Sequence, residues 1–281
     1  AKIVGLVTLP EGSPAVSDYV DLHPLCEEHG IETIDTANIN GRSTIEAIAG
    51  LEPDYLYTLG WSQLFGDELL SLPNRYVVGS HPSPLPESRG RAPVAWTILQ
   101  GCRRSAVTLF RMDIGVDSGP ILCQKWFSVP QQGYAGDLYE LVAANLRDAF
   151  CELHEAQQSG TVIPELVQPV DGSSYRAKRT PADGHIDFCQ SAKSIERLVR
   201  AVSFPYPGAY SYYEGSKVIF WRASLLEIPN HVGTPGQILL KRNGRLLVQA
   251  GDSPLWLFDS TGGGGAEPTA VLRVGCKLGY A

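Results

Sequence analysis

The sequence lacks the features that mark several common classes of protein. None of its apolar runs is long enough to cross a membrane, and the run at residues 2–8 is too short for a secretory signal. The six cysteines are scattered and form no Cys-x-x-Cys pair, as expected for reduced, mostly buried thiols. No strand is followed by Gly-x-Gly-x-x-Gly, so a dinucleotide site is not supported. We therefore expect a cytoplasmic protein without a membrane partner.

The sequence also lacks a block of Lys and Arg. Its 23 basic and 30 acidic residues give a net charge of −7, and the isoelectric point is near 5.4. An acidic chain repels a phosphate backbone unless its basic residues cluster, so we expect no nucleic-acid partner. Apolar residues make up 43% of the 281 positions, which is enough to fill two folded cores.

The first half alternates short apolar runs with helical patterns. This alternation predicts an α/β fold with a Rossmann-like, mostly parallel sheet and helices on both faces. In the first expected helix, Val20, Leu22, Leu25 and Cys26 would form the buried stripe. The expected strands cover residues 2–8, 31–35, 54–59, 76–80, 106–111 and 121–129. The expected helices cover residues 17–29, 43–50, 66–72, 92–99 and 137–158.

The second half changes to short β-rich runs separated by tight turns. One helix is expected at residues 191–203, and residues 262–265 are expected to form a flexible tip or tail. Five short strands predict a small β-barrel of the oligonucleotide/oligosaccharide-binding (OB) type. The expected strands cover residues 209–213, 217–223, 237–240, 246–250 and 255–258. We place the boundary near Gly172, which gives domains of residues 1–172 and 173–281.

His81 is the first candidate for chemistry. It lies between the strand at residues 76–80 and the helix at 92–99, and ligands of open α/β sheets bind beyond the carboxyl ends of strands. Three prolines, at 82, 84 and 86, fix the surrounding loop. A histidine held there can exchange a proton near neutral pH. A loop histidine can also simply satisfy carbonyl groups, but the rigid frame at a strand end favours a functional role.

The loop at residues 111–120 is the second candidate. Asp113 and Asp117 lie among glycines that let the backbone approach a ligand, and a carboxylate near His81 could take a proton from an amine. Taken alone, this loop is more typical of ordinary turn chemistry. We expect no metal, because the spacing of these residues matches no ligand motif. A serine hydrolase is disfavoured because Gly-x-Ser-x-Gly is absent.

Together these segments resemble the folate-dependent formyltransferases. The resemblance covers nearly the whole chain, and its first-half motifs are His81-Pro82-Ser83, Arg89-Gly90-Arg91-Ala92-Pro93 and Gly115-Val116-Asp117-Ser118-Gly119-Pro120. In the second half it continues through Arg179-Thr180-Pro181 and Pro205-Tyr206-Pro207-Gly208. Arg89 to Pro93 followed by Trp96 looks most like the enzymes that formylate nucleotide-linked amino sugars. Methionyl-tRNA relatives usually carry a basic loop, whereas residues 10–21 here contain no Lys or Arg.

The resemblance implies transfer of a formyl group from the co-substrate 10-formyltetrahydrofolate to a small-molecule amine. His81 and Asp117 match the family's catalytic residues. The residues implied for folate binding are Leu59, Gly60, Trp61, Arg89, Gly115 and Gly119. For Trp61, a role in ordinary packing fits the sequence equally well.

The chain departs from the family pattern at two places. Gly79 stands where the family has a catalytic Asn, and the loss of one oxyanion donor costs on the order of 100- to 1000-fold in rate. Ser80 should face the other side of the strand and cannot replace it. The family's extra first strand and helix are also expected to be absent before residue 2.

Three alternatives stay open from the sequence. A 10-formyltetrahydrofolate hydrolase fits because those relatives also lack the Asn. A methionyl-tRNA formyltransferase shares the core motifs. A non-catalytic folate- or nucleotide-binding relative would follow if Gly79 abolished activity. The oligomeric state is left open.

Overall fold

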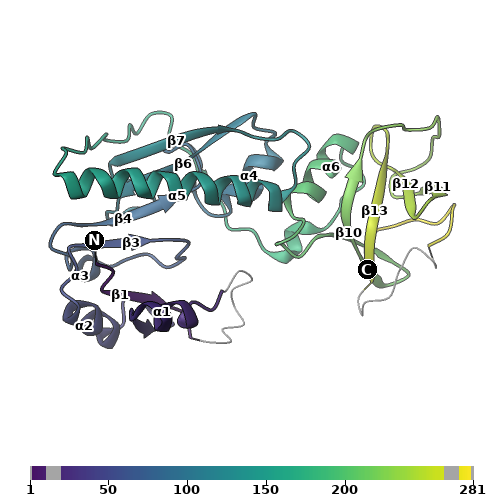
Figure 1. The fold of residues 1–281 in the computed structure, drawn as a ribbon. Coiled ribbons are helices and arrows are strands. Elements are labelled where there is room, and N and C mark those ends of the chain that lie inside the picture. Colours follow the sequence, from purple (N-terminus) through teal and green to yellow (C-terminus); the bar gives the residue numbers. More distant parts are fainter. Residues whose placement is uncertain (1, 11–19, 263–271, 280–281) are drawn as a thin grey trace. The chain divides into compact units, whose positions relative to one another are not determined.

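The computed structural model describes residues 2–10, 20–262 and 272–279. The expected helix start at residues 17–19 and the expected tip at 263–265 lie outside this range. The chain packs as two units (Figure 1). Unit 1 comprises the described residues of Ala1–Pro93, Ser105–Phe127 and Val142–Arg176. Unit 2 comprises Val94–Arg104, Ser128–Leu141 and the described residues of Ala177–Ala281, so two segments of the first half belong to it. The boundary near Gly172 stays a prediction.

Unit 1 is a mixed α/β structure. Its main sheet has the order β3-β4-β6-β7, in which β3 and β4 are parallel but β4 and β6 are antiparallel. A separate parallel pair joins β1 to β2. The expectation of one mostly parallel sheet is therefore confirmed only in part, because β6 reverses direction. These strands are β1 (Gly5–Thr8), β2 (Glu32–Asp35), β3 (Tyr55–Thr58), β4 (Tyr76–His81), β6 (Arg104–Arg111) and β7 (Ile121–Ser128).

Helices cover the strands of unit 1 through apolar and aromatic contacts. The long helix α5 (Ala135–Ser159) lies alongside β4, β6 and β7 (Figure 1), and its Phe150 packs edge-on against Tyr57 of β3, with ring centroids 5.7 Å apart. Ile39, Ile48 and Leu69 form a buried cluster, to which α2 (Arg42–Gly50) and α3 (Asp67–Leu70) contribute. Two elements of two residues each, β5 (Arg89–Gly90) and β8 (Tyr175–Arg176), pair in parallel.

The first helix is shorter than its sequence pattern predicts. Helix α1 spans His23–His29, with Pro24 in its first turn, a position that suits the fixed φ of proline. Val20 precedes the helix and is 67% exposed, and Leu25 is 51% exposed. The predicted buried stripe is therefore wrong except for Cys26.

Unit 2 is built on an antiparallel sheet with the order β11-β12-β13-β10-β9. Alternate residues of β9 and β10 point into the core, as in Val218 and Phe220. Helix α6 packs Ile195 and Val199 into the same core. The strands are β9 (Ala209–Tyr213), β10 (Ser216–Ser224), β11 (Ile238–Arg242), β12 (Arg245–Gln249) and β13 (Pro254–Gly262). The helical elements are α4 (Pro93–Leu99), which begins at the last residue of unit 1, the 3₁₀ turn η1 (Pro181–Gly184) and α6 (Ala192–Ala201).

A short C-terminal segment contacts both edge strands of this sheet. Gly279 exchanges two backbone hydrogen bonds with Tyr212 of β9, at 3.0 and 3.1 Å. Leu278 N–H donates to Gly236 O, just before β11, at 2.9 Å. Within residues 177–262 and 272–279 no ladder joins β9 directly to β11, so a closed barrel is not observed.

No helix in the described part of the chain is long and apolar enough to cross a membrane.

Candidate active site

His81 is the last residue of β4, and its ring is buried in the loop that follows. The His81 side chain is 7% exposed, and its Nε2 lies 2.9 Å from the carbonyl oxygen of Ser88. A carbonyl oxygen can only accept a hydrogen bond, so Nε2 carries the proton and donates. In the neutral ring, Nδ1 is then an unprotonated acceptor. Nδ1 is therefore the ring nitrogen that remains for substrate.

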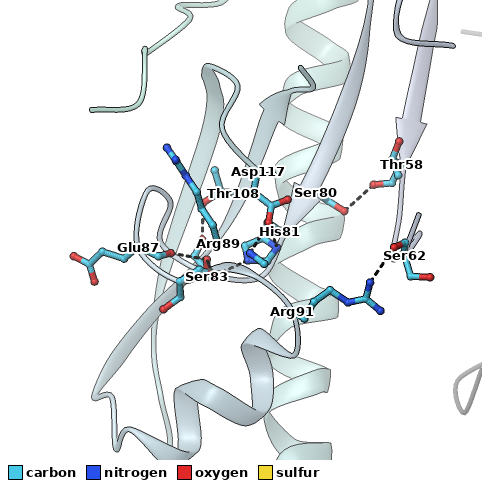
Figure 2. Close-up of polar contacts among 12 residues, drawn as sticks. Thr58, Ser62, Ser80, His81, Ser83, Glu87, Arg89, Arg91, Thr108 and Asp117 are labelled. Atoms are coloured by element: carbon cyan, nitrogen blue, oxygen red, sulfur yellow. Dashed lines mark hydrogen bonds and ion pairs between the residues drawn. The ribbon is translucent and has the colours of Figure 1, made fainter. Parts of the chain in front are cut away.

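Asp117 lies beside this free nitrogen (Figure 2). Its Oδ2 is 3.6 Å from His81 Nδ1, which is too far for a direct hydrogen bond, and it accepts the Gly90 N–H at 2.8 Å. Asp117 has a left-handed backbone with φ of +50°, a conformation that aspartate adopts more readily than most residues. The sequence prediction that His81 and Asp117 come together agrees with this geometry.

The gap between these two groups is suited to a hydrogen-bond donor from outside. Both Nδ1 and Oδ2 are acceptors, and no described residue supplies a proton between them. An amine or ammonium group carries several donors and can satisfy both. The arrangement can therefore bind a primary amine and remove its proton.

Three polar side chains for which the sequence predicts no individual role hold the loop after His81. Ser83 is fully buried, and its Oγ donates to Glu87 O at 2.9 Å. Thr108 donates to Ser83 O at 2.7 Å, and Gln124 donates both to Thr108 and to Leu85 O. The His81-Pro82-Ser83 motif is thus fixed by β6 and β7 as well as by its prolines.

Two glycines allow the backbone around Asp117 to pack closely. A Cβ at Gly119 would stand 1.8 Å from Arg111 O, so the loop folds back directly onto the end of β6. A Cβ at Gly90, whose φ is +100°, would stand 2.5 Å from Arg176 O. Only glycine fits such positions without displacing backbone. Gly119 therefore shapes the loop that carries Asp117.

Arg89, whose contact with folate stays a prediction, donates hydrogen bonds to residues inside the protein. Its side chain is 6% exposed, and Nε and Nη2 donate to Gln168 Oε1 at 3.1 and 2.7 Å. Nη1 donates to the Tyr175 hydroxyl at 3.1 Å. Gln168 in turn donates to the carbonyls of Asp117 and Gly119 at 2.9 and 2.7 Å. A buried arginine thus holds the glutamine that pins the Asp117 loop.

Gly79 lies in β4 opposite Phe110 of β6. A Cβ at position 79 would stand 2.6 Å from Phe110 Cζ and 2.8 Å from Met112 Cγ. The space of the family's usual Asn side chain is therefore filled by these two residues. Ser80 donates to Thr58 O at 2.8 Å, away from His81, as strand alternation predicts (Figure 2).

The loop after β3 lies near His81 at the carboxyl edge of the sheet. Ser62 O accepts a hydrogen bond from Arg91 Nη1 at 3.0 Å (Figure 2). Leu59 is 63% exposed, and Gly60 is exposed with φ of +66°. Trp61 packs against the Ile39 cluster, and its Nε1 is buried without a partner among the described residues.

The remaining predicted folate contact, Gly115, is exposed in the loop that carries Asp117. Its N–H donates to Asp113 Oδ1 at 3.0 Å. No cluster of three His, Cys, Asp or Glu side chains with the arrangement of a metal site occurs in residues 2–10, 20–262 and 272–279.

Comparison with known proteins identifies the family. The family model "Formyl transferase" matches residues 21–153, and "Formyl transferase, C-terminal domain" matches residues 178–267. A methionyl-tRNA formyltransferase of Alkaliphilus metalliredigens is 30% identical over 246 residues, covering 88% of this chain and 77% of the relative.

Two solved structures share the fold. HypX from Aquifex aeolicus matches with a TM-score of 0.66 and 21% identity over 89% of this chain, which spans only 44% of HypX. One HypX structure holds tetrahydrofolic acid. An N-formyltransferase from Helicobacter canadensis, in complex with folinic acid and dTDP-3-aminofucose, matches with a TM-score of 0.64 and 18% identity. This match covers 90% of the present chain and 87% of the other. The chain belongs to the formyl transferase family, enzymes of folate-dependent formyl transfer.

Proposed function

We propose that this chain transfers the formyl group of 10-formyltetrahydrofolate to the primary amine of a nucleotide-linked amino sugar. The observation that carries this proposal is the 3.6 Å gap between His81 Nδ1 and Asp117 Oδ2. Two acceptors that face one another without a proton of their own fit an incoming amine. The Gly90 N–H holds the carboxylate in place for it at 2.8 Å.

The first step is proton removal from the acceptor. A substrate ammonium donates hydrogen bonds to Asp117 and His81, and Asp117 takes one proton. The freed nitrogen lone pair attacks the formyl carbon, a new C–N bond forms, and the carbonyl electron pair moves onto oxygen.

The second step is collapse of the tetrahedral intermediate. His81 Nδ1 takes the second amine proton and gives it to N10 of the folate as the C–N10 bond breaks. The products are the N-formyl amine, tetrahydrofolate and one proton released from Asp117. Because Gly79 offers no side-chain donor, the protonated Nδ1 also stabilises the oxyanion in this scheme.

Folate contacts are proposed at the same edge of the sheet. Leu59 and Gly60 offer an exposed surface after β3, and the buried Trp61 Nε1 has a hydrogen bond to give. Gly115 and Gly119 let the backbone of the Asp117 loop approach the cofactor. We assign Arg89 a supporting role through Gln168, since it is buried and three of its N–H groups donate to Gln168 and Tyr175.

The charge of the first part of the chain favours a small acceptor over RNA. Residues 1–176, which include His81 and Asp117, contain 11 basic and 22 acidic residues. Such an excess of negative charge repels a nucleic-acid backbone. The solved N-formyltransferase with dTDP-3-aminofucose supports the amino-sugar assignment, since the match spans most of both chains.

One observation favours methionyl-tRNA as a second candidate acceptor. Residues 177–281 contain 12 basic and 8 acidic residues, so the positive charge that the whole-chain balance hides lies in this part. The curated relative at 30% identity is a methionyl-tRNA formyltransferase. We also propose that the segment at residues 277–279 completes an OB-like domain, because it bonds to both edges of the sheet.

An acceptor panel tests the proposal. The purified chain is given 10-formyltetrahydrofolate with UDP-, dTDP- and GDP-linked amino sugars, or with initiator methionyl-tRNA, and kcat/KM is measured for each. We expect one nucleotide-linked amino sugar to be the best acceptor. Preference for methionyl-tRNA would support the second candidate. Formate release without any acceptor would indicate a hydrolase, and folate binding without turnover would indicate a non-catalytic relative.

A further inference from the structure

A pocket whose residues are separate from the His81 site lies wholly within unit 2. It has a volume of about 540 Å³, within the range of small-ligand sites. Its walls come from the turn before β6, the segment before α5, one face of α6 and the end of β10. Nothing in the proposed formyl transfer uses these residues.

The pocket carries an excess of positive charge. It is lined by Arg103, Lys193, Arg197 and Arg200 and by one carboxylate, that of Glu196. Arg200 occupies that carboxylate with two hydrogen bonds of 2.6 and 3.1 Å, and both side chains are largely buried. The side chains of Arg103, Lys193 and Arg197 make no ion pair or hydrogen bond to any residue that the structure describes. Three cations therefore remain for a ligand, in a chain whose net charge is −7.

The guanidinium group of Arg197 lies against the backbone. A Cβ at Gly101 would stand 2.2 Å from Arg197 Nη2, so the guanidinium lies directly on the Gly101 turn. The surrounding walls are also fixed. Gln131 donates to the carbonyls of Cys102 and Val129 at 3.2 and 3.0 Å, and the Tyr134 hydroxyl bonds both backbone groups of Ala223 at 3.2 Å. A preformed wall lowers the entropy cost of binding.

The edge of the pocket is apolar. Leu225 and Leu226 line it and are 38% and 63% exposed. Cationic side chains beside exposed leucines suit a ligand that joins an anionic group to a less polar body. Guanidinium groups match phosphate oxygens in geometry and charge.

We propose that this pocket is a binding site for a phosphate ester, with Arg197, Lys193 and Arg103 as its cations. The phosphate can come from a free nucleotide or from the backbone of an RNA. The pocket volume of about 540 Å³ favours the nucleotide, since it lies in the range of small-ligand sites.

Calorimetric titration of the full chain tests the site with inorganic pyrophosphate, UDP and a short RNA hairpin. We expect one pyrophosphate to bind in this pocket. UDP should bind there as well, and UDP binding that survives Arg197→Gln belongs to the acceptor site beside His81. Arg197→Gln and Lys193→Gln should each weaken binding roughly tenfold or more, because each removes a charge-assisted contact. Arg242→Gln is the matched control, since Arg242 is an exposed arginine of β11 outside the pocket. It should leave binding unchanged.

The two phosphate sources are separated by their salt dependence. Tighter binding of UDP than of the hairpin assigns the site to nucleotides. Tighter binding of the hairpin, with an affinity that falls steeply with salt, assigns it to an RNA backbone. Failure of all three probes to bind, or an equal loss in Arg242→Gln, would overturn the proposal. Thermal unfolding of each variant checks that the substitutions leave the fold intact.

Discussion

Around His81 a buried arginine is engaged by neutral groups, whereas in the unit 2 pocket the lining carboxylate is engaged by an arginine. Arg89 gives its donors to Gln168 and Tyr175, so Asp117 keeps its negative charge for the substrate. Arg200 instead takes up Glu196, so Arg197 and Lys193 keep their positive charge. The region around His81 therefore suits an amine, and the unit 2 pocket suits an anion. Which charge is already paired decides which ligand fits.

The largest effect is expected from a substitution that removes the negative charge beside His81. Asp117→Asn keeps the side-chain shape but removes the base, so formyl transfer should fall about 100- to 10,000-fold in kcat. Asp113→Asn is the control in the same loop, because an Asn oxygen can still accept from Gly115 and Ser118. An equal loss in both variants would show that the loop rather than the Asp117 charge matters.

Removal of the Glu196 carboxylate tests the ion pair in the unit 2 pocket. Glu196→Gln leaves the buried Arg200 without its counter-charge, and we expect the free energy of unfolding to drop by about 3 kcal/mol. Glu46→Gln is the control, because Glu46 pairs with Arg42 at the same helical spacing on an exposed surface. Chemical denaturation should show almost no change for it. Similar losses in the two variants would mean that burial does not govern the Glu196 pair.

The link between Arg89 and Asp117 can be cut without removing a partner from the arginine. Gln168→Glu still accepts from Arg89 but no longer donates to the carbonyls of Asp117 and Gly119. The loop should shift, and kcat should fall about 100-fold with little loss of stability. Unchanged kcat would leave Gln168 a merely structural residue.

Gly79→Asn tests whether the missing family side chain can be restored. Because Phe110 and Met112 fill its space, the variant should lose about 1 to 3 kcal/mol of unfolding free energy and gain no activity. Adding Phe110→Ala makes room, and the double variant isolates the steric cause. A single Gly79→Asn variant that is stable and faster would refute the packing explanation.

Local sequence patterns predicted most elements but not the contacts that hold the site. The alternation in β9 and β10 and the length of α5 were visible because each depends on neighbouring residues. The pattern of residues 17–29 predicts too long a helix α1, because hydrophobic spacing does not register that Pro24 favours the first turn. The antiparallel direction of β6 depends on where the chain folds back, which no local period records.

The order of motifs predicts the His81 and Asp117 pair. It does not predict the hydrogen bonds from Arg89 and Gln168 that hold the Asp117 loop. Gln168 lies 79 residues after Arg89 in sequence, and nothing near it indicates a bond to that arginine. The basic character of residues 177–281 was present in the sequence but hidden by averaging charge over the whole chain.

The central claim is that a primary amine binds between His81 and Asp117 and receives the formyl group of 10-formyltetrahydrofolate there. The most direct measurement follows tetrahydrofolate release from 10-formyltetrahydrofolate with and without a nucleotide-linked amino sugar. We predict that release requires the amine and that one N-formyl product forms for each tetrahydrofolate. Release of formate at the same rate without any amine would contradict the claim.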